Sequence, residues 1–124
     1  MLPGFEDINH HLTDEEIQTL KDLVVPALKK KIGKANAVTN KAMREGVFKF
    51  YNVKISDPKM RRMIAYIRRC DLISKLCSCQ KGMFVAENDG EWENWKESMR
   101  KRINELQHNL YCAEFFSDGG NEKL

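Results

Sequence analysis

The chain has 124 residues, and its 42% hydrophobic and 31% charged residues are ordinary values for one soluble globular domain. Composition therefore excludes a disordered or fibrous chain. No run of about 18 apolar residues predicts a transmembrane helix. The N-terminal segment MLPGFEDINHHL has neither the basic nor the apolar region of a signal peptide. These features predict a cytoplasmic protein that is not bound to a membrane.

The net charge of +3 is distributed unevenly along the chain. Residues 1–53 carry eight basic and seven acidic residues, and residues 82–124 carry five basic and nine acidic residues. Residues 54–81 carry eight basic and two acidic residues, a net charge of +6. Such a basic segment is typical of a surface that binds a polyanion such as nucleic acid. A solvated helix face is the alternative explanation.

Local capping patterns predict the limits of the first helix. Thr13 and Glu16 form a capping box at its start. Apolar residues at helical spacing then predict a helix to about Ile32, with Gly33 as its stop. Pro26 lies inside this stretch and is expected to kink or split the helix in the preceding turn.

A second helix is expected over residues 40–51, with Thr39 as its N-cap. Asn52 is expected to end it, because asparagine tolerates the left-handed conformation. The expected inner face consists of Met43, Val47 and either Phe50 or Tyr51. Val53 and Ile55 are then expected to act as apolar contacts in the short connection to the next helix.

A third helix is expected over about residues 57–70, with Ser56 as its N-cap. At 100° per residue its apolar side chains fall in one stripe that faces the core. That stripe consists of Met60, Met63, Ile64 and Ile67. Arg62 and Arg69 lie on the opposite side, so we expect both to be exposed together.

The hydrophobic period then changes from helical to strand-like. Two β-prone runs, residues 72–77 and 83–86, flank a polar turn that ends in Gly82 and predict a hairpin over about residues 72–86. Asn88 and Glu91 form a looser cap pair, and a long final helix is expected over about residues 89–113.

The final helix carries an apolar stripe with the spacings 3, 4, 4, 3 and 4. Its members are Trp92, Trp95, Met99, Ile103, Leu106 and Leu110. The favoured interpretation is that the stripe closes the domain by packing on the first helix. Because the spacing is close to a heptad repeat, a homodimer seam is the alternative.

These elements predict a mainly α fold with a small β-hairpin (α+β). The predicted organisation is an N-terminal extension over residues 1–12, one domain over residues 13–114 and a flexible tail over residues 115–124. A helix-turn-helix followed at once by a two-stranded wing is the winged-helix plan, and its third helix can enter the major groove of DNA. The candidate DNA-binding residues are Lys59, Arg61, Arg62, Tyr66, Arg69, Gln80 and Lys81.

The chain also resembles a group of small winged-helix proteins encoded by phages and prophages. Four segments carry the resemblance: KIGKANAVTN at 31–40, ISD at 55–57, MIAYIR at 63–68 and KGMFVA at 81–86. It spans roughly residues 12–110 and implies a winged helix-turn-helix that binds double-stranded DNA, in phage gene regulation or as an accessory in replication. The chain departs from the expected wing at Cys77 and Cys79, where small or β-branched residues are typical.

Metal binding and catalysis have weak support in the sequence. The four cysteines include no C-x-x-C pair. A zinc site built from Cys77, Cys79, His108 and Cys112 is chemically allowed, but small buried thiols are the favoured explanation. The chain has no phosphate-binding glycine loop, no H-E-x-x-H and no G-x-S-x-G. We therefore expect no cofactor and no enzymatic activity.

The sequence thus predicts a double-stranded DNA-binding protein. The alternative is a winged-helix adaptor that binds other proteins through its aromatic final helix. The net charge of +6 over residues 54–81 favours DNA, since an adaptor does not need it.

Overall fold

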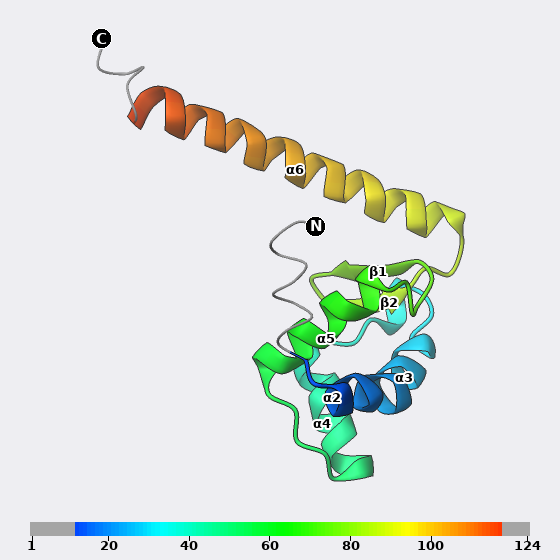
Figure 1. Ribbon diagram of the computed structural model, residues 1–124. Helices are drawn as coiled ribbons and strands as arrows, with labels where there is room; N and C mark the ends of the chain where they lie inside the picture. Colours follow the sequence, from blue (N-terminus) through cyan, green and yellow to red (C-terminus); the bar gives the residue numbers. More distant parts are fainter. Residues whose placement is uncertain (1–11, 118–124) are drawn as a thin grey trace.

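The computed structural model describes residues 12–117, and most of them are helical (Figure 1). The elements in chain order are α2 (Asp14–Thr19), η1 (Leu20–Val24), α3 (Val25–Lys29), η2 (Lys34–Asn36), α4 (Asn40–Tyr51), α5 (Asp57–Arg69), β1 (Leu76–Cys79), β2 (Gly82–Val85) and α6 (Asp89–Ser117). The fold is therefore mainly α with a small β-hairpin, as the sequence predicts. Within residues 12–117, no helix combines the length and the apolar character needed to cross a lipid bilayer.

The first helix is interrupted where Pro26 enters it. The capping box at its start is confirmed: the Thr13 hydroxyl accepts from the Glu16 amide at 3.1 Å, and Glu16 Oε1 accepts from the Thr13 amide at 2.9 Å. Pro26 has no N–H to continue the α-helical ladder, and the turn before it, η1, is π-helical. The predicted interruption is therefore a local widening that joins α2 and α3.

The prediction of a first helix that reaches Ile32 is wrong. α3 ends at Lys29, and Ile32 forms a parallel β-bridge with Val85. The Gly33 amide donates to the Val85 carbonyl at 2.8 Å, and Gly33 has a φ of 87° that suits glycine. Pairing with β2 satisfies these backbone groups better than one more helical turn, which helical periodicity alone does not reveal.

A second bridge ties the segment before α4 to the hairpin. Val38 and Met83 exchange both backbone hydrogen bonds, at 2.9 and 2.8 Å. The neighbouring Gly82 has a φ of 120°, and a Cβ at this position would lie 2.1 Å from the Val38 carbonyl oxygen. Only glycine permits this approach, so Gly82 fixes the hairpin against the segment that leads into α4.

The limits of α4 and α5 agree with their predicted caps. The hydroxyls of Thr39 and Ser56 accept from amides three residues later, at 3.1 and 3.2 Å. Asn52 ends α4 in the left-handed conformation with a φ of 57°. The predicted inner position for Phe50 or Tyr51 is wrong, because these side chains are 75% and 56% exposed. The last turn of α4 extends past the helices on which it packs (Figure 1).

The hairpin begins later than predicted. β1 pairs antiparallel with β2, Leu76 opposite Val85 and Cys79 opposite Gly82, so Cys79 belongs to a strand and not to the turn. The segment from residue 72 to residue 75 is not a strand, because Asp71 and Lys75 adopt positive φ angles of 51° and 57° that break the extended backbone.

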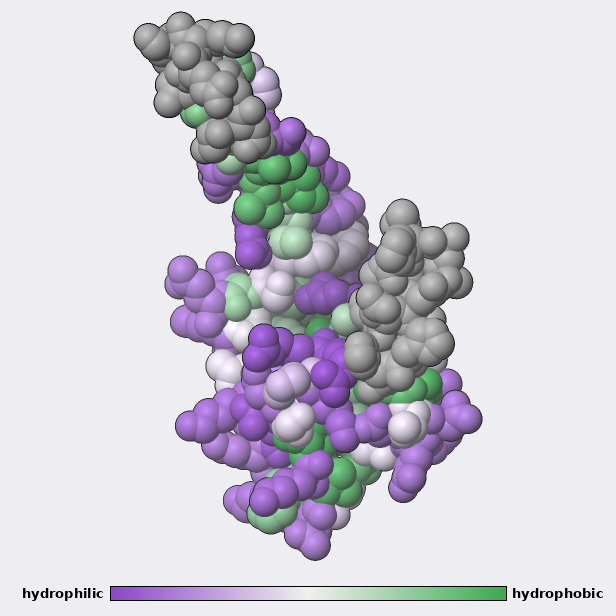
Figure 2. Space-filling model, turned by 60° about the vertical axis from the view of Figure 1, so that its left-hand side comes forward, coloured by the Kyte–Doolittle hydropathy of each residue, from purple (hydrophilic) through white to green (hydrophobic). Residues whose placement is uncertain are grey.

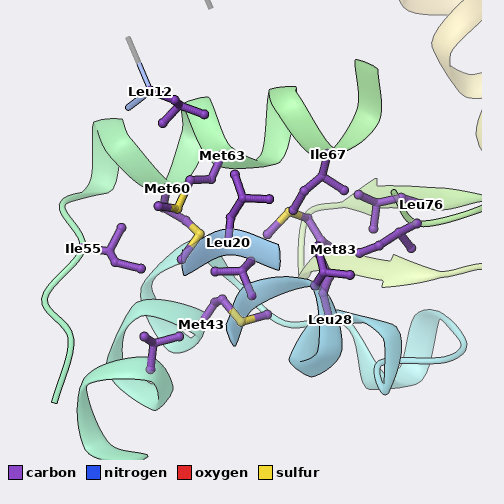
Figure 3. Close-up of a cluster of buried hydrophobic side chains, with 14 residues drawn as sticks. Leu12, Leu20, Leu28, Met43, Ile55, Met60, Met63, Ile67, Leu76 and Met83 are labelled. Carbon is purple, nitrogen blue, oxygen red and sulfur yellow. The ribbon is translucent and has the colours of Figure 1, made fainter. Parts of the chain in front are cut away.

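One apolar core joins the first helix, α4, α5 and the hairpin (Figure 3). From α5 it receives Met60, Met63 and Ile67, which are at most 1% exposed. Ile64, the fourth member of the predicted stripe, is only half-buried at the edge of this core. Leu12, assigned by the sequence to an N-terminal extension, is 5% exposed and belongs to the core. The other predicted extension residues, 1–11, lie outside the described part of the chain.

The final helix is longer than predicted and leaves the rest of the molecule. α6 continues to Ser117, past the expected end near residue 113, and its 29 residues span about 43 Å. It lies across the hairpin near its N-terminal end and then extends beyond the other elements (Figure 1). The remaining residues of the predicted tail, 118–124, are not among those described.

The favoured interpretation of the α6 stripe is wrong for its C-terminal half. Trp92, Trp95 and Met99 are half-buried, but Leu106 and Leu110 are 66% and 60% exposed. The stripe therefore does not close the domain against the first helix. A helical stripe shows that one side is apolar, but it does not identify the surface that this side meets.

Candidate nucleic-acid interface

The predicted interface has two parts, the outer side of α5 and the Gln80–Lys81 turn of the hairpin. The turn is exposed, so both of its polar side chains are available for contact. On α5, Arg61 is the most open of the candidates, with 71% of its side chain exposed. The other α5 candidates are half-buried: Lys59, Arg62, Tyr66 and Arg69.

Two of the α5 candidates are held by ion pairs within the chain. The Lys59 ammonium contacts the Glu16 carboxylate and so joins α5 to α2. This hydrogen bond is the main reason why the pKa of Glu16 lies below its usual 4.5, and the Thr13 amide adds to the effect. Arg61 pairs with Asp57 one turn earlier on α5. Part of the basic excess is therefore compensated locally.

Arg62 and Arg69 lie on the side of α5 away from the core, but they are half-buried and not fully exposed as expected. Part of each guanidinium group is buried as well, because Arg62 Nε and Arg69 Nη1 are shielded from solvent. Tyr66, which the helical wheel puts on the same outer side, packs against the edge of the core. Burial, and then a hydrogen bond with Cys70, raises the pKa of the Tyr66 hydroxyl.

Arg68 has a structural position that the sequence does not indicate. Its Nη1 donates to the Leu76 carbonyl at 2.8 Å, and its guanidinium lies 5.2 Å from the centre of the Trp95 ring. Burial lowers the pKa of Arg68, and burial also raises the pKa of the nearby Cys77 thiol. This arginine joins α5, β1 and α6, so its charge is not directed at an external ligand.

A groove of about 890 Å³ lies between the hairpin and α6. Lys34, Lys81 and Arg102 contribute positive charge to its lining, and Glu91 contributes a carboxylate. Sequence reasoning missed Lys34 and Arg102, because only the fold brings positions 34, 81 and 102 together. The groove extends the basic surface of the hairpin toward α6.

Glu91 is occupied by backbone contacts at the edge of this groove. Its carboxylate accepts from the Glu87 amide at 2.7 Å and the Lys34 amide at 3.0 Å, which lowers its pKa in that order. The predicted cap pair is confirmed, because Asn88 Oδ1 accepts from the Glu91 amide at 2.9 Å. These bonds fix the start of α6 next to the hairpin.

The alternative zinc site is not formed. Within residues 12–117, no group of three or more His, Cys, Asp or Glu side chains is placed to hold a metal ion. Cys112 lies 3.6 Å from His108 on the exposed part of α6, whereas Cys77 is buried in the hairpin. The fold therefore separates the two pairs that the sequence offered as ligands.

The arrangement offers hydrogen-bond donors and positive charge. Arg61 and Lys81 can donate to phosphate oxygens, and an arginine or a glutamine can also contact a base edge. No family model, curated protein or solved structure matches this chain.

Proposed function

We propose that this chain is a winged-helix protein that binds double-stranded DNA, in phage or prophage gene regulation or as an accessory to phage replication. The observation that carries the proposal is the packing of α4, α5 and the hairpin. α5 follows α4 after the short connection of residues 52–56, buries its apolar stripe and is followed by a two-stranded hairpin. The bridges from Ile32 and Val38 to β2 hold that hairpin beside the helices as a wing.

In this proposal α5 is the helix that enters the major groove. Its 13 residues span about 20 Å, and the groove is wide enough to admit an α-helix. On the half of α5 that follows its N-cap, Arg61 is exposed and Arg62 is half-buried. The exposed ion pair between Arg61 and Asp57 is worth at most about 1 kcal/mol, so DNA can compete for this arginine. Lys81 at the turn of the hairpin then contacts the phosphate backbone of the DNA.

The ion pairs limit how many phosphates the basic segment can neutralise. Of its eight basic residues, Lys59, Arg61 and Lys75 pair with carboxylates, and Arg68 is half-buried under Trp95. We therefore expect about four or five phosphate contacts and a slope of log K against log salt near −4.

A titration of fluorescent random-sequence duplex DNA over a series of salt concentrations tests the proposal. The parent protein is expected to bind at low salt with that slope, and Arg62→Ala together with Lys81→Ala is expected to weaken binding strongly. Lys49→Ala, which removes an exposed charge from the far end of α4, is the matched control and leaves the affinity nearly unchanged. Absence of binding at low salt contradicts the proposal, as does an equal loss in the control.

A second candidate function is contact with another protein through α6. The exposed side chains of Ile103, Leu106 and Leu110 favour it, because a chain that acts alone seldom leaves a continuous apolar stripe in water. Such contact serves either a homodimer or an adaptor, and both are compatible with DNA binding by α5. The DNA titration does not decide between them, because neither needs DNA.

A further inference from the structure

The projecting part of α6 carries an apolar stripe with a regular heptad spacing. We define the α6 stripe as Met99, Ile103, Leu106, Leu110 and Ala113. At 100° per residue these five positions fall within an arc of about 80°. Every residue from 100 to 111 is exposed, and Figure 2 shows apolar side chains gathered on the part of α6 that stands clear of the other elements.

The start of α6 is held firmly, so the stripe is projected into solvent. The indole of Trp95 donates to the Ser78 hydroxyl at 3.3 Å and stacks on Trp92, with ring centres 5.3 Å apart. Lys75 pairs with Asp89 at 2.9 Å. These contacts all lie before Met99, and the described residues place no other element over Ile103, Leu106 or Leu110.

The charges beside the stripe are separated along the helix. Residues 96–102 carry four basic residues and one acidic residue, a net charge of +3. Residues 103–117 carry two glutamates and neither lysine nor arginine, a net charge of −2. Within the described part of α6, Lys96 pairs with Glu93 and Arg100 pairs with Glu97, so both ion pairs lie at the basic end, and Arg100 and Glu97 are each 58% exposed. The charges of the projecting helix are therefore complementary to those of a second copy that runs in the opposite direction.

We propose that the α6 stripe is covered by the α6 stripe of a second copy of this chain, with the two helices antiparallel. An antiparallel pair places the basic segment of each copy beside the acidic segment of the other. A parallel pair in register instead places Lys96 opposite Lys96 of the partner subunit, at a core position of the heptad. Charge therefore selects the antiparallel orientation.

The heptad register gives specific layers. With Leu106 opposite the partner's Leu110, Ile103 lies opposite the partner's Ala113, so a large side chain meets a small one. The same register places Arg100 beside the partner's Glu114 twice, once on each side of the two-fold axis. The paired stretch begins beyond Trp92 and Trp95, so the helical bodies of the two copies, which we define as residues 12–88, lie at opposite ends of the paired helices.

This inference deepens the contact role proposed for α6 and does not depend on DNA binding by α5. Its first test is the molar mass of the full chain over a range of concentrations, measured by analytical ultracentrifugation without DNA. The parent mass is expected to rise toward twice the 14.5 kDa of one chain. Leu106→Glu with Leu110→Glu is expected to stay monomeric, with unchanged unfolding, because both positions are exposed in one copy.

Tyr111→Glu is the matched control for the loss of an exposed large side chain and the gain of a charge. Tyr111 is 63% exposed but lies about 100° around the helix from Leu110, outside the α6 stripe. The control is expected to keep the dimer. A parent that is monomeric at every concentration overturns the proposal, and so does a control that dissociates as fully as the double variant.

Charge exchange tests the orientation. Arg100→Glu and Glu114→Arg are each expected to weaken self-association about five- to twentyfold, because each replaces two attractive contacts with two repulsive ones. A mixture of the two single variants is expected to recover the parent affinity as a heterodimer. In a parallel pair these positions lie about 21 Å apart along the axis, so the mixture gains little. If the mixture does not restore self-association, the antiparallel arrangement is wrong. DNA binding by the monomeric Leu106→Glu, Leu110→Glu variant is measured separately, so failure of the dimer proposal can be distinguished from failure of the proposed function.

Discussion

Several leucine side chains are buried in the helical body of residues 12–88, but those on the projecting part of α6 are exposed. In the helical body Leu20 and Leu28 are fully buried between helices and the hairpin (Figure 3). On α6, Leu106 and Leu110 lie four residues apart on one apolar side of the helix and are 66% and 60% exposed. Spacing makes one side of a helix apolar, but burial requires an opposing element. The difference shows that the core side chains of the helical body are covered within one chain, whereas those on the projecting part of α6 are left exposed by the described residues.

The largest effect that sharpens this comparison is expected from Leu28→Ala. Leu28 is 0% exposed, and its truncation leaves a cavity in the shared core, with an expected loss of about 3 kcal/mol in the free energy of unfolding. Leu106→Ala is the matched control, because it deletes the same atoms from an exposed site and is expected to change stability by at most about 0.5 kcal/mol in the dilute chain. Urea unfolding measures both, and similar losses contradict the comparison.

The sequence predicts well those features that depend on neighbours along the chain. The caps at Thr13, Thr39 and Ser56 are confirmed, because each is a bond between a side chain and an amide three residues later. The buried side of α5 is confirmed at Met60, Met63 and Ile67 for a similar reason, since one helical period decides which residues share a face.

Features that depend on distant pairing could not be predicted in this way. Ile32 leaves the helix because Val85, more than fifty residues later, offers a β-bridge. Arg68 lies under Trp95 for the same reason: the contact needs the hairpin to bring α6 over α5. Periodicity assigns the candidate residues to α5 and the hairpin turn, but the half-burial of Arg62 and Arg69 depends on surroundings that a helical wheel does not contain.

Trp95 joins the two regions, and its truncation is the next largest expected effect. Trp95→Ala removes the hydrogen bond to Ser78, the stacking on Trp92 and the cover over Arg68. Because Trp95 is half-buried, we expect a loss of about 2 kcal/mol, less than the roughly 3–5 kcal/mol typical of a fully buried tryptophan. Differential scanning calorimetry measures the loss of stability. Proteolytic cleavage within α6 is also expected to become faster. An unchanged melting temperature means that α6 is not held through this residue.

A smaller effect, on the proposed DNA binding alone, distinguishes the hairpin from α6. Lys81→Ala is expected to weaken binding to all duplex sequences alike and to reduce the steepness of the salt dependence by about one. Lys101→Ala removes the same charge from an exposed position on α6 and is expected to leave that slope unchanged. Neither variant is expected to alter stability, since both side chains are exposed. If the salt dependence has the same slope for both variants, Lys81 does not contact the DNA backbone and the proposed DNA-binding surface is wrong.

The smallest expected effect concerns ion pairs, which also differ between the two regions. The pair of Glu16 with Lys59 joins α2 to α5, whereas the pair of Glu97 with Arg100 lies within α6. Glu16→Gln keeps an acceptor for the capping box but removes the charge, so it tests the pair alone. For Glu16→Gln we expect a loss of about 0.5–1 kcal/mol in the free energy of unfolding at neutral pH. The loss is expected to be smaller for Glu97→Gln, because Glu97 and Arg100 are both 58% exposed.

The pH dependence shows whether the Glu16 charge is the cause. The pKa of Glu16 in the folded chain lies below its usual 4.5, first because of the Lys59 hydrogen bond. A carboxyl whose pKa falls on folding stabilises the folded state above its unfolded pKa, and this contribution disappears as the pH falls through the folded value. The stability of the parent is therefore expected to converge on that of Glu16→Gln as the pH falls below 4.5, in urea unfolding over a pH series. A difference that persists in acid assigns the loss to the capping box, and Lys59 then remains available to a DNA phosphate.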